Sequence, residues 1–207
     1  MIVRWGVDEL AGVLETLSVR DPLLISTERW RDLELPVARR FYGAQPHAEV
    51  AGVRAATEAA AGADGLVALG GGSAIDTAKA VSSETGLPIV SIPTTYSGAE
   101  WTQGFGMRDS AAGVKRGGGG ARTVAVLYEP SLTLGLPAGE SAGSAMNALA
   151  HCAELGALAG PARLREYGVP REDLEALSEA VAERAPAKAN PRPAPPEAIR
   201  ELLEEIW

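Results

Sequence analysis

The chain has 207 residues, 46% of them hydrophobic, so it is long enough to bury a core in one or two domains. Its 27 acidic residues outnumber its 19 basic ones, and the resulting formal charge of -8 argues against a nucleic-acid partner. This charge still permits one small anionic ligand, because a helix N-terminus can bind phosphate through backbone N–H groups alone.

The sequence predicts neither a secreted protein nor a membrane protein. Residues 1–6 begin no apolar stretch typical of a signal peptide, and the single cysteine, Cys152, cannot form an intrachain disulfide. Even the apolar run at 65–70 is interrupted by glycine and is too short to cross a bilayer. We therefore expect a cytoplasmic protein that acts on a small molecule, with no membrane partner.

The first half of the chain alternates short apolar runs with longer segments rich in Ala, Glu and Arg. This alternation predicts βα units that build a parallel sheet. Each run is nearly continuous in apolar residues and is bounded by Gly, Pro or Asp, as expected of strands covered on both faces. The expected strands are residues 22–26, 65–69, 88–92 and 123–127.

Two amphipathic helices are expected between these strands. The first covers residues 47–63, begins at His47 as a cap or surface residue, and places Val50 and Val53 on one face. The second follows Ser73, covers residues 75–84 and ends at Gly86.

The remainder of the chain changes character twice. Residues 97–120 are rich in Gly and polar side chains, which predicts a loop or an irregular hairpin rather than a core strand. Beyond Pro137 the pattern is helical, over residues 141–159, 171–184 and 197–206, with an Ala- and Pro-rich stretch before the last helix. The expected domains are an α/β dinucleotide-binding domain, 1–137, and a helical part, 138–207.

A strand leads through three glycines into a helix at Leu69-Gly70-Gly71-Gly72-Ser73. Glycines let a backbone approach a pyrophosphate closely, and Ser73 is expected to cap the helix and to offer its hydroxyl to an anion. The alternative is that the glycines only make a tight turn, and the spacing fits neither G-x-G-x-x-G nor a Walker loop. The next strand favours a ligand site, because Thr94, Thr95 and Ser97 follow it at the edge where open α/β sheets bind ligands.

The two stretches GGGS-x-x-D-x-x-K and PTT-x-x-G-x-E resemble the nucleotide signature of the iron-containing alcohol dehydrogenase family, and further similarity continues to Glu154. The resemblance implies a dehydroquinate synthase-like nucleotide-binding fold and an NAD or NADP cofactor. It implies that the pyrophosphate lies at the glycine turn, supported by Asp76, and that hydroxyl groups line the adenosine and nicotinamide side. The implied cofactor residues are Gly70, Gly71, Gly72, Ser73, Asp76, Thr94, Thr95, Ser97, Thr102 and Lys115, the last with a solvated surface lysine as its alternative.

The metal ligands of this family are only partly present. Its metal-dependent members use an Asp and a His four residues apart on one helix, and here Asn147 occupies the Asp position before His151. Asn at this site resembles the maleylacetate reductase branch, whose members need no metal. His151 is therefore expected either to polarise the substrate as the catalytic residue or to be a helix residue with satisfied hydrogen bonds.

After Glu154 the sequence resembles the extreme C-terminus of the family, so most of its helical domain is expected to be missing. Two functions follow as hypotheses. The first is an NAD(P)H-dependent reductase of maleylacetate or a related carbonyl compound, and the second is a catalytically impaired module that binds dinucleotide. A sugar-phosphate cyclase ranks last, and an exposed apolar face on the 141–159 helix would favour a homo-oligomer.

The loop after Ile25 leaves the choice of cofactor open. Glu28 could accept hydrogen bonds from the ribose of NAD, whereas Arg29 could meet the 2′-phosphate of NADP.

Overall fold

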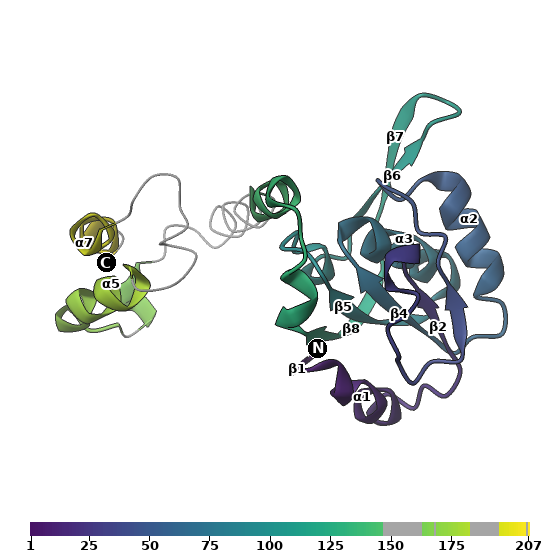
Figure 1. Ribbon diagram of the computed structural model, residues 1–207, viewed down its shortest axis with the longest axis horizontal. Coiled ribbons are helices and arrows are strands. Elements are labelled where there is room, and N and C mark those ends of the chain that lie inside the picture. The colour runs from purple at the N-terminus through teal and green to yellow at the C-terminus, as the bar shows by residue number, and fades with distance from the viewer. Residues whose placement is uncertain (147–162, 168, 183–194, 206) are drawn as a thin grey trace. The chain divides into compact units, whose positions relative to one another are not determined.

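The computed structural model describes residues 1–146, 163–167, 169–182, 195–205 and 207 (Figure 1). The chain forms two compact units, Met1–His151 and Cys152–Trp207. The sequence predicted a boundary at another place, between a dinucleotide-binding part, 1–137, and a helical part, 138–207. Because that boundary is defined by cofactor binding, it stays a prediction. No helix among the described residues is long and apolar enough to span a membrane.

The first unit contains a six-stranded sheet in which every neighbouring pair is parallel. The four strands expected from the sequence are confirmed, and two further strands form its edges. In spatial order the strands are β1 (Ile2–Trp5), β8 (Arg122–Tyr128), β5 (Pro88–Pro93), β4 (Gly65–Gly70), β2 (Pro22–Ile25) and β3 (Arg39–Phe41). All carboxyl ends therefore lie along one edge, where Gly70 is paired with Pro93.

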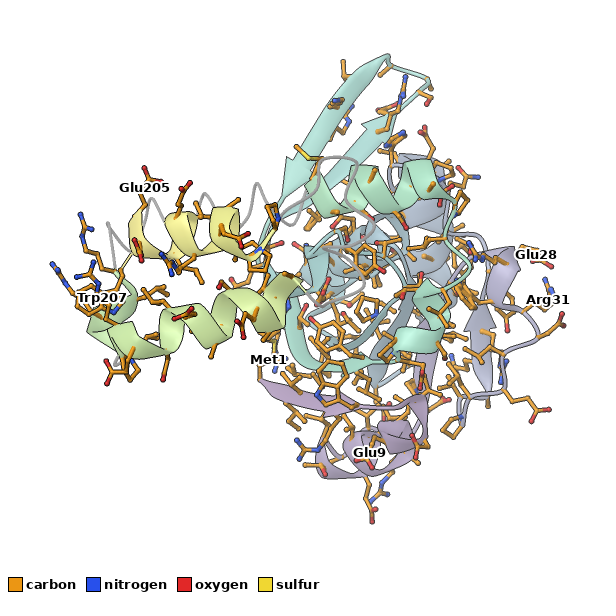
Figure 2. The ribbon with its side chains drawn as sticks, turned by 60° about the vertical axis from the view of Figure 1, so that its left-hand side comes forward. Met1, Glu9, Glu28, Arg31, Glu205 and Trp207 are labelled. Carbon is orange, nitrogen blue, oxygen red and sulfur yellow. The ribbon has the colours of Figure 1, made fainter. Side chains whose placement is uncertain are left out.

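Helices cover both faces of this sheet. One face packs against α1 (Leu10–Thr16), which follows Glu9 (Figure 2), and the other packs against α2 (Val50–Ala59) and α3 (Gly72–Thr85). Residues 138–146 are also helical. Short 3-10 turns are η1 (Val7–Glu9), η2 (Glu28–Trp30), η3 (Ala99–Trp101) and η4 (Pro130–Thr133).

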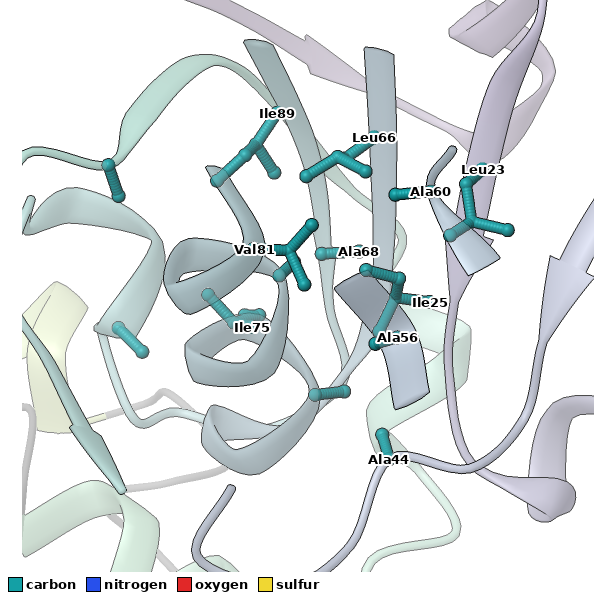
Figure 3. Packing of buried hydrophobic residues seen from close by; sticks show 14 residues of the cluster. Leu23, Ile25, Ala44, Ala56, Ala60, Leu66, Ala68, Ile75, Val81 and Ile89 are labelled. Atoms are coloured by element: carbon teal, nitrogen blue, oxygen red, sulfur yellow. The ribbon is translucent and has the colours of Figure 1, made fainter. Parts of the chain in front are cut away.

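The core explains the continuous apolar runs of the strands. Leu66 and Ala68 of β4 pack with Ile75 and Val81 of α3 (Figure 3), whereas Val67 of the same strand faces the α1 side. Because alternate residues of a strand point to opposite faces, a strand covered on both sides must be apolar at nearly every position. All six residues of β4 are buried.

Three local expectations were wrong. The first helix begins at Val50 rather than His47, because His47 and Ala48 adopt left-handed φ values of 59° and 47° that no right-handed helix contains. Ser73 does not cap α3, which begins at Gly72 after Gly71 and has no side-chain cap. Helix α3 also begins earlier than the expected residue 75, and it ends at Gly86 as predicted, with that glycine left-handed at φ 73°.

The segment 97–120 contains a hairpin of β6 (Phe105–Asp109) and β7 (Val114–Gly118), so the hairpin alternative is confirmed. The prediction that this segment contains no core strand is also confirmed, because every residue of β7, Gly117 and Gly118 included, is exposed. The Phe105 ring packs in the space that a side chain on Gly118 would occupy, and cross-strand aromatic packing of this kind stabilises glycine in a strand.

The second unit contains η5 (Leu164–Tyr167), η6 (Arg171–Asp173), α5 (Leu174–Ala182) and α7 (Pro196–Glu205). Within the described part of this unit, the indole N–H of Trp207 donates to the carbonyl of Val169 at 2.9 Å. The guanidinium groups of Arg165 and Arg171 lie 5.8 and 5.4 Å from the centroid of the Trp207 ring, within cation–π range. The predicted helices over 171–184 and 197–206 are confirmed within the described residues, and the predicted helix over 141–159 lies outside them beyond residue 146.

Candidate functional site

The glycine turn lies where β4 leaves the sheet and α3 begins. Gly70 has a φ of 147°, which L side chains rarely adopt, and its carbonyl accepts the N–H of Thr94 at 3.0 Å. This hydrogen bond joins the ends of two neighbouring parallel strands. The turn and the polar segment after β5 are therefore brought together at the carboxyl edge, as the sequence predicted.

Gly71 and Gly72 of this turn lie against their neighbours, and Gly71 has no room for a side chain unless Thr95 moves. A Cβ on Gly71 would lie 2.7 Å from Cγ2 of Thr95, closer than side-chain atoms approach, and a Cβ on Gly72 would lie 3.3 Å from Oγ of Ser97. The close approach places the hydroxyl side chains of the β5 segment directly against the turn. Six of the ten predicted cofactor residues thus form one cluster: Gly70, Gly71, Gly72, Thr94, Thr95 and Ser97. Thr94 is 4% exposed.

The cluster has unused hydrogen-bonding capacity. The N–H groups of Gly72 and Ser73 donate to no group in the described part of the chain, as is usual for the first turn of a helix. The Oγ1 atom of Thr95 is buried and has no hydrogen-bond partner among the same residues. Free N–H groups at the positive end of a helix such as the 14-residue α3 can bind an anion, and a hydroxyl beside them can donate to the same anion.

The Ser73 side chain has a partner that the sequence did not indicate. Its Oγ atom accepts the backbone N–H of His47 at 2.9 Å, from the left-handed turn before α2. A hydroxyl has one donor and two acceptor positions, so this contact leaves the Ser73 proton free to donate to an anion. His47 therefore contributes its main chain to the turn and is exposed, so of its two predicted roles the surface residue is confirmed and the helix cap was wrong.

Asp76 and Thr102 belong to a second cluster, around Lys79. The Nζ atom of Lys79 donates to Ala99 O at 2.8 Å, to Thr102 Oγ1 at 2.9 Å and to Asp76 Oδ1 at 3.2 Å. The other Asp76 oxygen accepts the N–H of Gly106 at 3.3 Å. Burial lowers the pKa of Lys79, and the Asp76 carboxylate partly opposes this effect.

A third group of polar side chains adjoins this cluster through Glu100, which is 4% exposed. Tyr128 donates its hydroxyl to Glu100 Oε1 at 3.0 Å and accepts the indole N–H of Trp101 at 2.7 Å. Burial, together with the Glu100 carboxylate, raises the pKa of Tyr128 to about 12. The Oε2 atom of Glu100 is buried without a partner among the described residues.

Charged side chains of the loop after β2 make contacts with other groups of the chain. Glu28 and Arg31 form an ion pair at the surface (Figure 2), and this hydrogen bond lowers the pKa of the Glu28 carboxyl. Arg29 donates to the carbonyl of Gly135 at 3.1 Å. An open hollow of about 840 Å³ adjoins this loop and is lined by Glu28, Arg31, Ala38, Arg40, Phe41, Tyr42 and Gly43.

Lys115 does not join the cluster. Lys115 lies in β7, opposite Arg108 of β6, and is exposed. His151 and Asn147 lie outside the described residues, so their predicted roles stay predictions. No group of three or more His, Cys, Asp or Glu side chains that could hold a metal occurs in the described part of the chain.

Sequence reasoning missed the buried role of Lys79 and the contact between His47 and Ser73. A signal for Lys79 was present, since it follows Asp76 by three residues and interrupts an otherwise apolar and small helix segment. A charge at such a position needs a partner on the next turn or on a neighbouring element. The contact with His47 had no signal, because it depends on the main chain of a distant loop.

Comparison with known proteins agrees with this geometry. The model of the iron-containing alcohol dehydrogenase family matches residues 12–128, more than half of the chain, and the chain belongs to this family. Maleylacetate reductase from Pseudomonas knackmussii is 41% identical over 167 residues, which cover 73% of this chain and 47% of that protein. The chain thus spans about half the length of the relatives it matches.

Solved structures give the same result. The crystal structure of maleylacetate reductase from Rhizobium sp. strain MTP-10005 is 32% identical with a TM-score of 0.69, and the match covers 100% of this chain and 61% of that chain. Maleylacetate reductase from Agrobacterium tumefaciens matches with a TM-score of 0.68 at 29% identity, covering 100% of this chain and 61% of its own. The predicted family and the predicted α/β fold are confirmed.

Proposed function

We propose that the chain binds NAD or NADP at the turn between β4 and α3. The observation that carries this proposal is the contact of Gly71 with Thr95, beside N–H groups of Gly72 and Ser73 that have no partner in the described chain. Such a turn fits a pyrophosphate, because it combines a close backbone approach with donors at a helix N-terminus. The residues that would hold the pyrophosphate are Gly71, Gly72, Ser73 and Thr95.

We further propose that the chain is an NAD(P)H-dependent oxidoreductase that reduces maleylacetate or a related carbonyl compound. Relatives named maleylacetate reductase support this substrate class. The cofactor would supply the hydride, and the protein would supply binding and orientation. His151 is proposed to polarise the substrate carbonyl, a task that a hydrogen-bond donor performs when it points at the oxygen that gains charge.

We propose that this reaction needs no resident metal, because neutral Asn147 stands where metal-dependent members have a ligand Asp. Treatment of the purified protein with a chelator should leave dinucleotide binding and any turnover unchanged. Loss of turnover that is restored by Fe²⁺ or Zn²⁺ would contradict the proposal.

A second candidate is a chain that binds dinucleotide without turnover. It is favoured by one observation, that the sequence after Glu154 resembles the extreme C-terminus of the family, since an internal deletion of most of the helical domain would reduce substrate positioning and water exclusion. The test is a fluorescence titration with NADH and NADPH, followed by addition of maleylacetate while NADH absorbance is recorded. Binding with oxidation supports the reductase, binding without oxidation supports the second candidate, and no binding overturns both.

A His151→Gln variant refines this test. It should keep the dinucleotide affinity of the unmodified chain and lose turnover, because a carbonyl-polarising group acts on the substrate rather than the cofactor. Unchanged turnover would show that His151 is a helix residue without a catalytic role.

A further inference from the structure

The Lys79 ammonium joins two segments that are far apart in the sequence. Its side chain extends from the middle of α3, is 1% exposed, and donates to the Ala99 carbonyl and the Thr102 hydroxyl. Asp76, one turn earlier on α3, binds the N–H of Gly106. Three contacts thus connect α3 with residues 99–106, which run from η3 into the start of β6.

The same two segments also meet at their other ends. Helix α3 begins at Gly72, and Oγ of Ser97 lies 3.3 Å from the position of a Cβ on Gly72. Residues 97–106 therefore lie against α3 at two places, beside the glycine turn at Ser97 and farther along the helix at Lys79. Between the two attachments lies η3, with the buried carboxylate of Glu100.

A buried lysine does not in itself make the folded chain more stable than an apolar side chain would. Removing an ammonium from water is unfavourable, and replacement of both partners of a buried ion pair with apolar groups of similar volume is often neutral or stabilising. The lowered pKa of Lys79 reflects the same cost, because burial disfavours its charged form. What the ammonium supplies that an apolar side chain cannot is three directed donors, and here they are aimed at Asp76, Ala99 and Thr102.

We propose that Lys79 is a positioning residue of the dinucleotide site, and the proposal rests on the function proposed above. It acts through residues 99–106: its ammonium holds this segment against α3, so that Ser97 and Thr95 stay against the glycine turn. Lys79 touches no cofactor in this arrangement. Its role differs from that of Lys115, which lies exposed on the hairpin and is the lysine that the family resemblance assigned to the ribose and phosphates.

The test compares Lys79→Met with Arg54→Met, which removes a positive charge from an exposed position of α2. Lys79→Met keeps most of the side-chain volume but leaves Asp76 and the Ala99 carbonyl without their donor, so its thermal midpoint should be lower than that of the unmodified chain. Amide hydrogen exchange over residues 99–106 should rise by about tenfold while exchange in β4 and β5 stays unchanged. Affinity for NADH or NADPH should fall by about tenfold, because residues 99–106, which directly follow Thr95 and Ser97 in the chain, are no longer held against α3.

A purely structural role for Lys79 would also lower the thermal midpoint, but it would raise exchange throughout α3, β4 and β5 and leave the dinucleotide affinity of the folded chain unchanged. That pattern, or an equal loss of affinity in Arg54→Met, would overturn the proposal. Thr102→Val is the second variant: it removes one acceptor of the ammonium with little change of shape, and it should also raise exchange over residues 99–106. If the unmodified chain binds neither dinucleotide, the proposed function fails, while the exchange measurements still decide whether Lys79 holds the segment.

Discussion

Gly71 and Thr95 meet at the carboxyl edge of the sheet, where a Cβ on Gly71 would lie 2.7 Å from Cγ2 and 3.2 Å from Oγ1 of Thr95. The backbone of Gly71 is extended at φ -78°, a conformation open to any residue. Its requirement for glycine is therefore one of space, not of backbone strain. The missing side chain brings the Thr95 hydroxyl beside the first turn of α3.

This contact predicts that Gly71→Ala is harmful. Overpacking against Thr95 should destabilise the fold by about 1–3 kcal/mol and weaken dinucleotide binding, because Thr95 must shift from the turn. Chemical denaturation and NADH titration would measure both effects. The matched control is Gly12→Ala in α1, where no atom lies within 4 Å of the new Cβ.

The control should stabilise the chain by about 0.5–1 kcal/mol, since alanine has the higher helix propensity. A Gly71→Ala variant that is as stable and binds as well as the unmodified chain would show that Thr95 can move away without consequence.

Ser73 gives a second prediction, because its hydroxyl accepts the His47 N–H and keeps its own proton free. Ser73→Ala should weaken NADH binding by about tenfold or more, as expected for one lost hydrogen bond to a charged group. Ser83→Ala, in the last turns of the same helix, is the control and should leave binding unchanged, since its hydroxyl donates to Gly119 O on the hairpin side. Equal binding by both variants would contradict an anion contact at Ser73.

The four inner strands of the sheet, β2, β4, β5 and β8, were predictable from the sequence because they are covered on both faces. Leu66, Val67 and Leu69 form a continuous apolar run for this reason, and glycine marks both ends of β4. The edge strands β1 and β3 were not predicted. Arg39 and Arg40 of β3 are polar, since a strand at the edge of the sheet is only partly covered.

Only those residues of the binding cluster that lie at the ends of strands could be predicted from the sequence to lie close together. Thr94 and Gly70 follow neighbouring parallel strands, so their proximity is a consequence of sheet topology. The contacts of Lys79 with Ala99 and Thr102 depend on how an irregular segment folds back onto a helix. No periodicity encodes such a contact, so the sequence led to Asp76 and Thr102 as cofactor residues and left their partner unassigned.

A third prediction concerns the choice between NAD and NADP. The Glu28 carboxylate pairs with Arg31 and so neutralises a cation in the loop after β2. Glu28→Gln should raise the affinity for NADPH relative to NADH by a few-fold, because Arg31 becomes available to a 2′-phosphate while an acceptor for the ribose is lost. Glu58→Gln, at an exposed position of α2, makes the same charge change and should leave the ratio unaltered. Paired titrations with both cofactors provide the measurement, and an unchanged ratio in Glu28→Gln would place this loop outside the cofactor site.

Tyr128 gives a prediction about pH that needs no cofactor. Burial and the neighbouring Glu100 raise its pKa from 10.0 to about 12, so the folded chain holds this proton more tightly than the unfolded chain. The resulting contribution to stability is complete below pH 10 and is lost as the pH rises towards 12. Tyrosinate absorbance should therefore show a late step that Tyr128→Phe removes.

Tyr96→Phe is the control for this titration, because Tyr96 is 47% exposed, and it should keep the late step. At neutral pH, Tyr128→Phe should also destabilise the chain by about 1–3 kcal/mol, since Glu100 loses the donor to Oε1 and Trp101 loses its acceptor. The loss of stability relative to the unmodified chain should shrink as the pH passes 10, because the unmodified chain then loses the same contribution. A late step that persists in Tyr128→Phe, with circular dichroism confirming that the chain is still folded, would assign the raised pKa to another tyrosine.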